Sequence, residues 1–480
     1  YTGGVVAAGL LLSGGVLLAQ AVVYPVYLMV MVQGHRVDGL SSVVAGVLNL
    51  GGLPAAVNQG LIFVQTGSET IPISITWEKL GLLPWVLLLV GAVVVCMMVF
   101  RRYSWWRPIV VFVLLSGVVV VVRLVGMVLW YVSSGELALF WDPWVWVVSF
   151  VPVAVVLVYL LGVRWEGLVD DPLKSLRVSR RLVGAGFVVF LCVGFLVGAL
   201  GWYDGGSEKA GRVLIDEVHS EWEDSVRPLD MEWFGLLSTY NYYSWAEWMN
   251  ASYAVRRNVD QVLSESVLAD VDVLILKCPT NSYSAEEIGA ITRFVETGGG
   301  LWLIGDHTDV FGMNTFLNQI APVFGIRFRN DATYELGSGN MTGVCRPVWF
   351  GHPIIQDVDE VRFMTSCSLE GPWGGEQVLL GRRLIAEPGT YATENFFRES
   401  VESAEAEFGM FLQMVAVRYG AGRVVAFSDS TVFSSFSFFS DGYADLTAGT
   451  LAYLNRVNSS PSVSLVLWIG ALVCGGVFVC

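Results

Sequence analysis

The chain has 480 residues, of which 54% are hydrophobic and 15% charged, and its formal net charge at pH 7 is −15. Residues 203–460 carry most of that charge, since they hold 35 of the 43 acidic and 17 of the 28 basic side chains. Such an acidic segment argues against nucleic acid and anionic lipid headgroups as its partners, because both are bound through positive patches. Solubility alone is the simpler explanation of this charge.

Apolar runs dominate the sequence outside that segment. Each run is about long enough to cross a hydrocarbon core of roughly 30 Å, so the pattern predicts six spanning helices. The runs lie at about 4–32, 82–100, 108–132, 143–163, 182–202 and 463–480. A cleaved signal peptide is the alternative for the first run, although that run is long for one and lacks a basic n-region.

Basic residues orient the predicted spans. They lie between the second and third spans and between the fourth and fifth, so both loops are expected in the cytoplasm. These residues are Arg101, Arg102, Arg107, Arg164, Lys174, Arg177, Arg180 and Arg181. The sequence therefore predicts an integral membrane protein, with a five-helix transmembrane bundle (1–203), an extracytoplasmic domain (204–460) and a C-terminal membrane helix (461–480). Membrane lipid is then an expected partner.

Three charged residues lie within or beside the apolar spans, near their predicted outer ends. They are Glu78, Arg123 and Asp142. An unpaired charge inside a bilayer is costly, so the three are predicted to form an ion cluster. Such a cluster either fixes the packing of the helices or serves a function.

Residues 55–165 resemble the exosortase and archaeosortase transpeptidases. A β-like segment leads directly into a helix, and Arg123 matches the arginine of those enzymes. The enzymes carry a cysteine where this chain has Trp77-Glu-Lys79, and a histidine where it has Trp141-Asp142. Without the thiol, cysteine transpeptidation cannot proceed. The resemblance therefore implies a degenerate scaffold, or a site refitted with carboxylates, and we favour the scaffold.

From Gly211 onward, short β-rich runs alternate with amphipathic helical segments, as an α/β fold requires. Strands are expected at 212–215, 271–276, 301–304 and 423–427. A helix begins at the capping-box sequence Ser284-Ala-Glu-Glu and ends at Gly298-Gly-Gly300. A right-handed crossover makes the strands on either side of this helix parallel.

Polar residues follow the carboxyl ends of these strands, which is where such sheets bind ligands. The candidate catalytic residues are Asp216, His219, Asp306, His307 and Asp429, and the candidate binding residues are Glu217, Thr280, Thr308, Ser430, Thr431 and His352. Imidazole and carboxylate groups together suit acid/base chemistry or a divalent metal such as zinc, iron or manganese. The tentative metal ligands are His219, Asp306 and His307. The alternative is that these residues only cap helices and tie loops together.

The order of motifs over residues 211–456 resembles the class I glutamine amidotransferase-like domains, in particular their membrane-anchored members. The motifs are Leu274–Thr280, Phe294–Gly300, Gly305-Asp306, Gly351-His-Pro353 and Tyr419–Asp429. This resemblance implies a flavodoxin-like parallel sheet with helices on both faces. Working amidotransferases carry a cysteine in a Gly-x-Cys-x-Gly turn, but the corresponding turn here reads Gly305-Asp-His-Thr-Asp309. The difference argues against glutaminase chemistry.

The function expected first is a binding or assembly module in cell-envelope processing, which recognises a polymer, peptide or protein with its strand-end loops. One alternative is a membrane-bound hydrolase or transferase that uses the Asp/His cluster, with or without a divalent metal. The other is an accessory subunit of a larger membrane complex, whose contacts come from aromatic-rich segments such as 240–245 and 433–439. Both non-enzymatic functions imply a protein partner.

Overall fold

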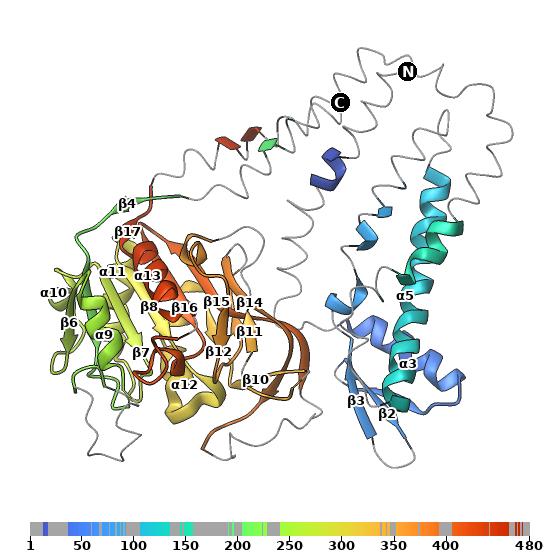
Figure 1. Cartoon of the computed structure of the whole chain (residues 1–480), viewed down its shortest axis with the longest axis horizontal. Coiled ribbons are helices and arrows are strands. Elements are labelled where there is room, and N and C mark those ends of the chain that lie inside the picture. The colour runs from blue at the N-terminus through green and yellow to red at the C-terminus, as the bar shows by residue number, and fades with distance from the viewer. Residues whose placement is uncertain are drawn as a thin grey trace. The chain divides into compact units, whose positions relative to one another are not determined.

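The computed structural model describes two main parts of the chain. The first covers residues 37–92 without 59, 67–69, 76, 82–83, 87 and 90–91, and residues 106–156 without 135–144 and 146–147. The second covers residues 204–459 without 223, 228–240, 337, 342, 346–351, 373–374, 393–405 and 441. Elsewhere only short pieces within 13–17, 191–195 and 466–473 are described. The two parts belong to separate compact units, and the second unit contains Asp204–Ser459 (Figure 1).

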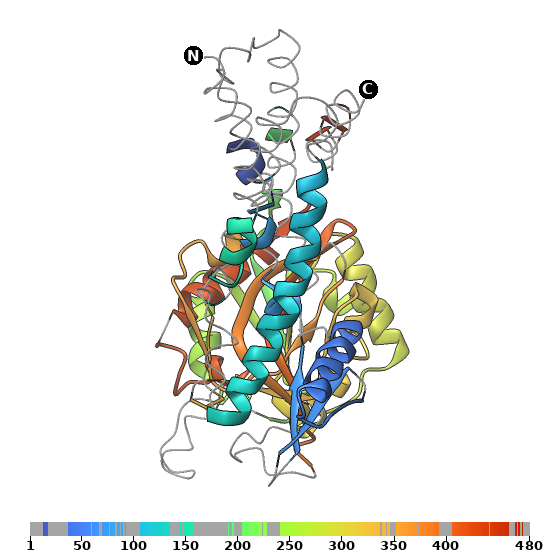
Figure 2. The same cartoon turned by 90° about the vertical axis from the view of Figure 1, so that its right-hand side faces the viewer.

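The described residues of the first unit include a small antiparallel sheet and two helices that contact each other. Its strands are β1 (Ala55–Asn58), β2 (Leu61–Gln65) and β3 (Thr70–Ser74), paired in that order. Helix α3 (Asp38–Leu50) contacts the long helix α5 (Trp106–Ser134), as Figure 2 shows, and a short 3-10 helix, η2, covers Trp77–Leu80.

Helix α5 covers the apolar run predicted at 108–132. Within the described part of the chain it is the one helix that is long and apolar enough to cross a membrane, judged by length and composition alone. The runs predicted at 4–32, 82–100, 143–163, 182–202 and 463–480 lie outside the described residues, apart from short pieces. The described structure therefore gives no support for a transmembrane bundle.

The second unit contains a mixed sheet of ten strands in its described residues. One half is parallel and runs in the order β16 (Gly422–Phe427), β8 (Gly300–Ile304), β7 (Val273–Lys277), β5 (Arg212–Asp216) and β6 (Ala254–Asn258). The other half is antiparallel and continues from β16 through β15 (Glu407–Tyr419) and β14 (Glu376–Pro388) to β10 (Asp331–Glu335). Two short strands, β9 (Arg327–Phe328) and β13 (Leu369–Glu370), pair with each other, and β13 also pairs with β15.

The prediction of an α/β fold is therefore confirmed, but the expectation of a parallel sheet holds for one half only. Outside the large sheet, β4 (Ser207–Glu208) pairs with β17 (Arg456–Val457), and β11 (Gly343–Cys345) pairs with β12 (Val361–Phe363).

Two helices of the second unit, α11 (Ala285–Glu296) and α13 (Tyr443–Leu454), cover opposite faces of the parallel half. The other helices in the described residues of this unit are α9 (Tyr243–Asn250), α10 (Glu265–Leu268) and α12 (Met313–Leu317). Successive residues of a strand point to opposite faces of its sheet. A Cβ atom at Gly422 would meet the Val295 carbonyl of α11, whereas the next side chain, Arg423, lies on the Tyr453 ring of α13. These two helices therefore lie on opposite faces.

Helix α11 begins as the sequence predicts. The Ser284 side chain accepts a hydrogen bond from the Glu287 amide, and the Glu287 side chain accepts one from the Ser284 amide. The part of this unit that the structure describes also contains four 3-10 turns: η5 (His307–Gly312), η6 (Ala321–Phe324), η7 (Pro353–Ile355) and η8 (Thr431–Phe433).

Candidate functional site

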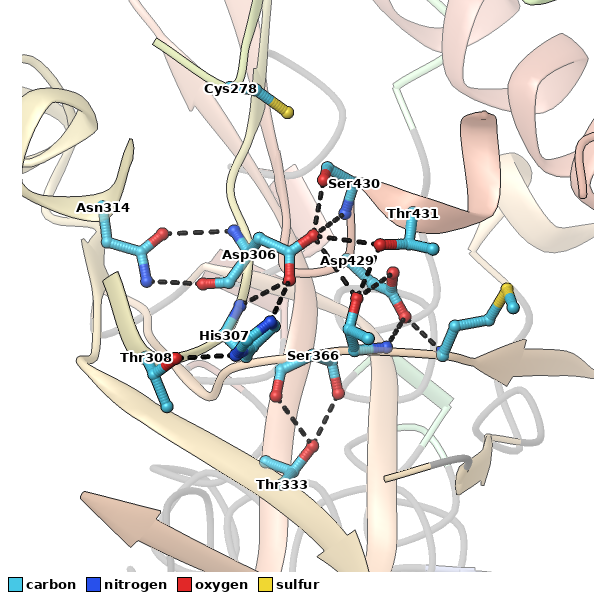
Figure 3. Close-up of polar contacts among 12 residues, drawn as sticks. Cys278, Asp306, His307, Thr308, Asn314, Thr333, Ser366, Asp429, Ser430 and Thr431 are labelled. Carbon is cyan, nitrogen blue, oxygen red and sulfur yellow. Dashed lines mark hydrogen bonds and ion pairs between the residues drawn. The ribbon is translucent and has the colours of Figure 1, made fainter. Parts of the chain in front are cut away.

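Asp306 directly follows β8 and lies at the centre of a buried polar cluster (Figure 3). A glycine is needed immediately before it, because a Cβ atom at Gly305 would lie 2.6 Å from Asn314 Oδ1 and from the Phe328 ring. The Asn314 side chain can then bind the main chain of Asp306, donating to its carbonyl at 2.6 Å and accepting from its amide at 3.2 Å. These contacts fix the carboxyl group at the end of the strand.

The Asp306 carboxyl group joins the loop after β8 to the loop after β16. Its Oδ2 atom accepts hydrogen bonds from the Ser430 amide at 3.1 Å and from the Ser430 hydroxyl at 2.5 Å. A further contact of 3.4 Å comes from the Thr431 hydroxyl. Its Oδ1 atom accepts from the His307 amide at 2.7 Å. Strands β8 and β16 are neighbours in the sheet, which is why their loops meet.

Asp429 belongs to the same cluster. Its Oδ2 atom accepts hydrogen bonds from the amides of Met364 and Thr365, the second at 2.9 Å. The Thr365 hydroxyl lies between the two carboxyl groups, 3.4 Å from Asp306 Oδ2 and 3.5 Å from Asp429 Oδ1. Thr365 is thus a site residue that the sequence analysis missed, and no motif around it marks it as one.

Burial changes the pKa of each titratable group in this cluster. It raises the pKa of Asp306 to about 6, against hydrogen bonds that lower it. It raises the pKa of Asp429 to about 7, with a further contribution from the nearby Asp306 charge. It lowers the pKa of His307 to about 4, so this imidazole is neutral at pH 7. The His307 Nδ1 atom lies 2.6 Å from the Thr308 hydroxyl.

His219 forms a second cluster with different carboxylates. Its Nδ1 atom lies 2.7 Å from Asp216 Oδ2, and its Nε2 atom lies 3.3 Å from Glu287 Oε1. The Asn258 side-chain amide donates to the other Asp216 oxygen at 3.1 Å, and the Tyr283 ring stacks on the imidazole. Burial alone would lower the pKa of His219, but Asp216 and Glu287 raise it above its ordinary value.

The remaining candidates make separate contacts. Glu217 pairs with Lys277 at 3.0 Å, and the side chains of both are almost fully buried. The Thr280 hydroxyl accepts from the Glu221 amide at 3.0 Å. His352 lies 2.8 Å from Glu376 Oε2, and its Nδ1 atom accepts from the Ile354 amide, so it caps a turn away from both clusters.

The structure does not assemble the tentative metal site. His219 lies in one cluster, and Asp306 and His307 lie in the other. Among the described residues, no group of three or more His, Cys, Asp or Glu side chains is placed so that it could hold a metal ion.

The charge cluster predicted for the first unit can be followed only at Arg123. Its guanidinium donates to the Lys79 carbonyl at 2.7 Å and to the Ser149 hydroxyl at 3.0 Å. Asp142 and the side chain of Glu78 lie outside the described residues.

An aromatic group borders the first cluster, and the sequence analysis did not single it out. The rings of Trp222 and Phe311 have centroids 4.7 Å apart, and the Tyr391 ring is 5.1 Å from that of Phe311. Trp222 is 37% exposed and Phe311 is 42% exposed. We call Trp222, Phe311 and Tyr391 the rim aromatic group. Trp222 and Phe311 follow the carboxyl ends of β5 and β8.

Comparison with known proteins gives one family match. Residues 236–335 match the model of the IFT52 GIFT domain. No curated protein matches the chain.

Several solved structures are similar to about half of the chain. The mmIFT52 N-terminal domain is 12% identical and covers 51% of this chain and 97% of its own, with a TM-score of 0.38. A cytoplasmic protein from Salmonella typhimurium is 16% identical and covers 52% of this chain and 100% of its own, with a TM-score of 0.32. A ThuA-like protein from Parabacteroides merdae is 11% identical and covers 53% and 92%, with a TM-score of 0.33.

The family match corrects two predictions. The matching model is that of the IFT52 GIFT domain, so the assignment to membrane-anchored glutamine amidotransferase-like domains is wrong. The prediction of an integral membrane protein with its large domain outside is wrong for the same reason. That prediction relied on six spans, and in the described residues α5 alone has the length and composition of one. The exosortase-like assignment of residues 55–165 has no support. A lipid partner likewise has no support. The region that can be compared with known proteins is the α/β unit, through its residues 236–335.

Proposed function

We propose that the α/β unit is a binding module that docks another protein against the edge where its parallel strands end. The observation that carries this proposal is the exposure of the rim aromatic group on that edge. Large aromatic side chains are enriched in protein interfaces, and a few of them commonly supply most of the binding energy. Trp222 and Phe311 remain more than a third exposed although they contact each other.

The backbone beneath Phe311 supports the same proposal. Phe311 has φ 52°, and the preceding Thr308 and Asp309 have φ 44° and 54°. This left-handed region is unfavourable for residues with a Cβ atom, and such residues concentrate at functional sites. Asp309 holds the loop through the amide and the hydroxyl of Thr315, at 2.8 Å and 2.6 Å. The loop therefore holds an exposed phenylalanine at a fixed position.

The buried carboxyl cluster has a supporting role in this proposal. Asp306 is 3% exposed and Asp429 is fully buried, and their oxygens accept hydrogen bonds from neighbouring loops. A group that acts on a substrate must be reached by it, whereas a group that fixes loops need not be. We therefore infer that this cluster holds the loops that carry the binding surface. The match of residues 236–335 to the IFT52 GIFT domain also supports a protein partner rather than a small substrate.

A hydrolase or transferase remains the second candidate because of one observation. The raised pKa values of Asp306 and Asp429, about 6 and 7, are those of carboxyl groups that can give and take protons near neutral pH. This candidate requires an opening that lets a substrate reach the cluster. Asp306→Asn and Asp429→Asn would abolish such an activity, whereas Phe311→Ser would leave the chemical step intact.

The binding proposal is tested by quantitative co-purification from the native host. The wild-type chain, a Trp222→Ser/Phe311→Ser double variant and a Leu50→Ser control would be compared. Leu50 is 90% exposed and belongs to the first unit, so its loss controls for a general decrease in surface hydrophobicity. We expect the double variant to lose at least one stoichiometric partner that the control retains. Identical partner profiles for all three proteins would refute the proposal.

A further inference from the structure

A cleft lies at the opposite edge of the parallel half, where the strands begin. Residues that precede β5, β7 and β8 in the chain line it, together with residues of α10, α11 and β17, and its volume is about 440 Å³. Its apolar lining consists of Leu268, Ala269, Val271, Ala290, Phe294 and Val457. None of the groups described above reaches this edge.

The two acidic groups that line the cleft already have partners. Asp272 binds the Arg212 guanidinium through both oxygens, at 3.0 Å and 3.1 Å. Glu265 pairs with Arg293 across the outer part of the cleft. These four charges therefore neutralise one another in pairs.

Lys209 is the exception among the charged residues of the cleft. Its Nζ atom donates to the Asp272 carbonyl at 2.6 Å and to the Gly298 carbonyl at 2.8 Å. An ammonium group has three N–H donors, so one remains after these two bonds. Within the described part of the chain, no carboxylate makes an ion pair with this ammonium.

The electrostatics of Lys209 agree with a missing counter-charge. Burial lowers its pKa to about 8. The charge of Asp272 opposes this shift, while the charges of Arg423 and Arg212 add to it. Asp272 compensates the half-buried ammonium only in part, and both oxygens of this carboxylate are already bound by Arg212, so a bound anion would supply the remaining counter-charge.

We propose that this cleft binds a small carboxylate-bearing molecule with an apolar body, whose carboxylate accepts a hydrogen bond from Lys209 Nζ. The apolar body would lie against the side chains of Leu268 and Phe294, which gives the cleft a second, hydrophobic source of affinity. The site is separate from the proposed protein-binding surface, because the two lie at opposite ends of the parallel strands.

The test uses the full-length chain, isothermal titration calorimetry and hexanoate as the probe, with hexanol as its neutral counterpart. We expect hexanoate to bind with a Kd below about 1 mM, and at least tenfold more tightly than hexanol. Its affinity should fall about thirtyfold between pH 7 and pH 9.5, because an amine with a pKa of about 8 loses its proton over this range. No binding of hexanoate, or equal binding of hexanol, would overturn the proposal.

Variants locate the binding. Lys209→Met should weaken hexanoate binding at least tenfold, whereas Arg256→Met, which removes one exposed positive charge elsewhere, should leave it unchanged. If Lys209→Met fails to fold, Ala269→Trp tests the location of the binding site. The tryptophan side chain would fill the cleft from an exposed position, so this variant should bind both hexanoate and hexanol more weakly. Unchanged affinity in Ala269→Trp would show that hexanoate binds elsewhere and that the proposal is wrong.

Discussion

Asp306 accepts two hydrogen bonds from Ser430, a residue that lies 124 positions later in the chain. The contact is possible because β8 and β16 are parallel neighbours and Phe427 pairs with Ile304, so both loops begin at the same level of the sheet. One carboxyl group thus joins the middle of the unit to its C-terminal part. Its removal should therefore affect the stability of the whole unit and not only one loop.

Asp306→Ala is expected to lower the free energy of unfolding by about 3 kcal/mol, because it leaves the buried Ser430 amide and hydroxyl without their acceptor. Asp306→Asn should cost less, since an amide oxygen can still accept one of these bonds. Urea unfolding followed by circular dichroism measures both. A loss below about 0.5 kcal/mol for Asp306→Ala would contradict the structural role assigned to this carboxyl group.

Asp429 should make the unit less stable as the pH rises toward 7. Its pKa is raised from 3.8 to about 7, so between these values the folded state binds more protons than the unfolded state. The free energy of unfolding then falls with increasing pH, by at most about 1.4 kcal/mol per pH unit for one proton. His307 acts in the opposite direction, because its folded pKa is lowered to about 4.

Asp429→Asn should remove the Asp429 contribution to the slope between pH 6 and pH 7. Over this range the folded His307 is neutral and the unfolded His307 loses its proton, so the opposing contribution of His307 is the same in the wild type and in the variant. Urea unfolding at closely spaced pH values measures the slope. His219→Gln is the matched control, because the pKa of His219 is also raised in the folded state and its stabilising contribution is likewise lost as the pH rises. A wild-type slope that survives in Asp429→Asn but disappears in His219→Gln would assign the proton to the histidine.

His219→Ala is expected to destabilise the unit by about 3 kcal/mol, because it leaves Asp216 and Glu287 as two buried carboxylates without the imidazole between them. Protein binding at the rim aromatic group should persist under conditions in which the variant is folded. Thermal unfolding and the co-purification assay measure the two properties separately. Loss of partner binding in a folded His219→Ala protein would place this histidine in the binding surface.

The parallel half of the sheet could be predicted because its strands are buried on both faces. Strands β7 and β8 are therefore short, continuous apolar runs, and the glycines and polar residues around them mark their ends. The long strands β14 and β15 were missed. In β14 the exposed pair Arg382 and Arg383 interrupts two buried stretches, and bulges shift its pairing with β15, so no regular alternation reveals the strand.

The structure brings the candidate catalytic residues, which follow the carboxyl ends of the strands, together in two groups and not in one. The order of the strands explains this grouping, because β7 lies between β5, which His219 follows, and β8, which His307 follows. Each histidine therefore finds its own partners. Glu287 was recognised only as a helix cap, although it also contacts His219. Such contacts depend on the strand order, which the spacing of motifs along the chain does not specify.

Phe311→Gly should separate stability from binding. Phe311 has φ 52°, a conformation that glycine adopts without the penalty imposed by a Cβ atom, and its side chain is 42% exposed, so little buried surface is lost. We expect the free energy of unfolding to stay constant or to rise by up to about 1 kcal/mol. If the rim aromatic group is the docking surface, partner recovery should nevertheless fall.

Gly312→Ala provides the matched control for Phe311→Gly. Gly312 has φ 80°, and a Cβ atom there would lie 2.9 Å from the Phe316 ring, so this variant should be less stable while keeping the exposed phenylalanine. The two neighbouring substitutions are thus expected to change stability in opposite directions, and only Phe311→Gly should reduce binding directly. If Phe311→Gly is as stable as the wild type and recovers the same partners, Phe311 is not part of the docking surface, and its left-handed backbone needs another explanation.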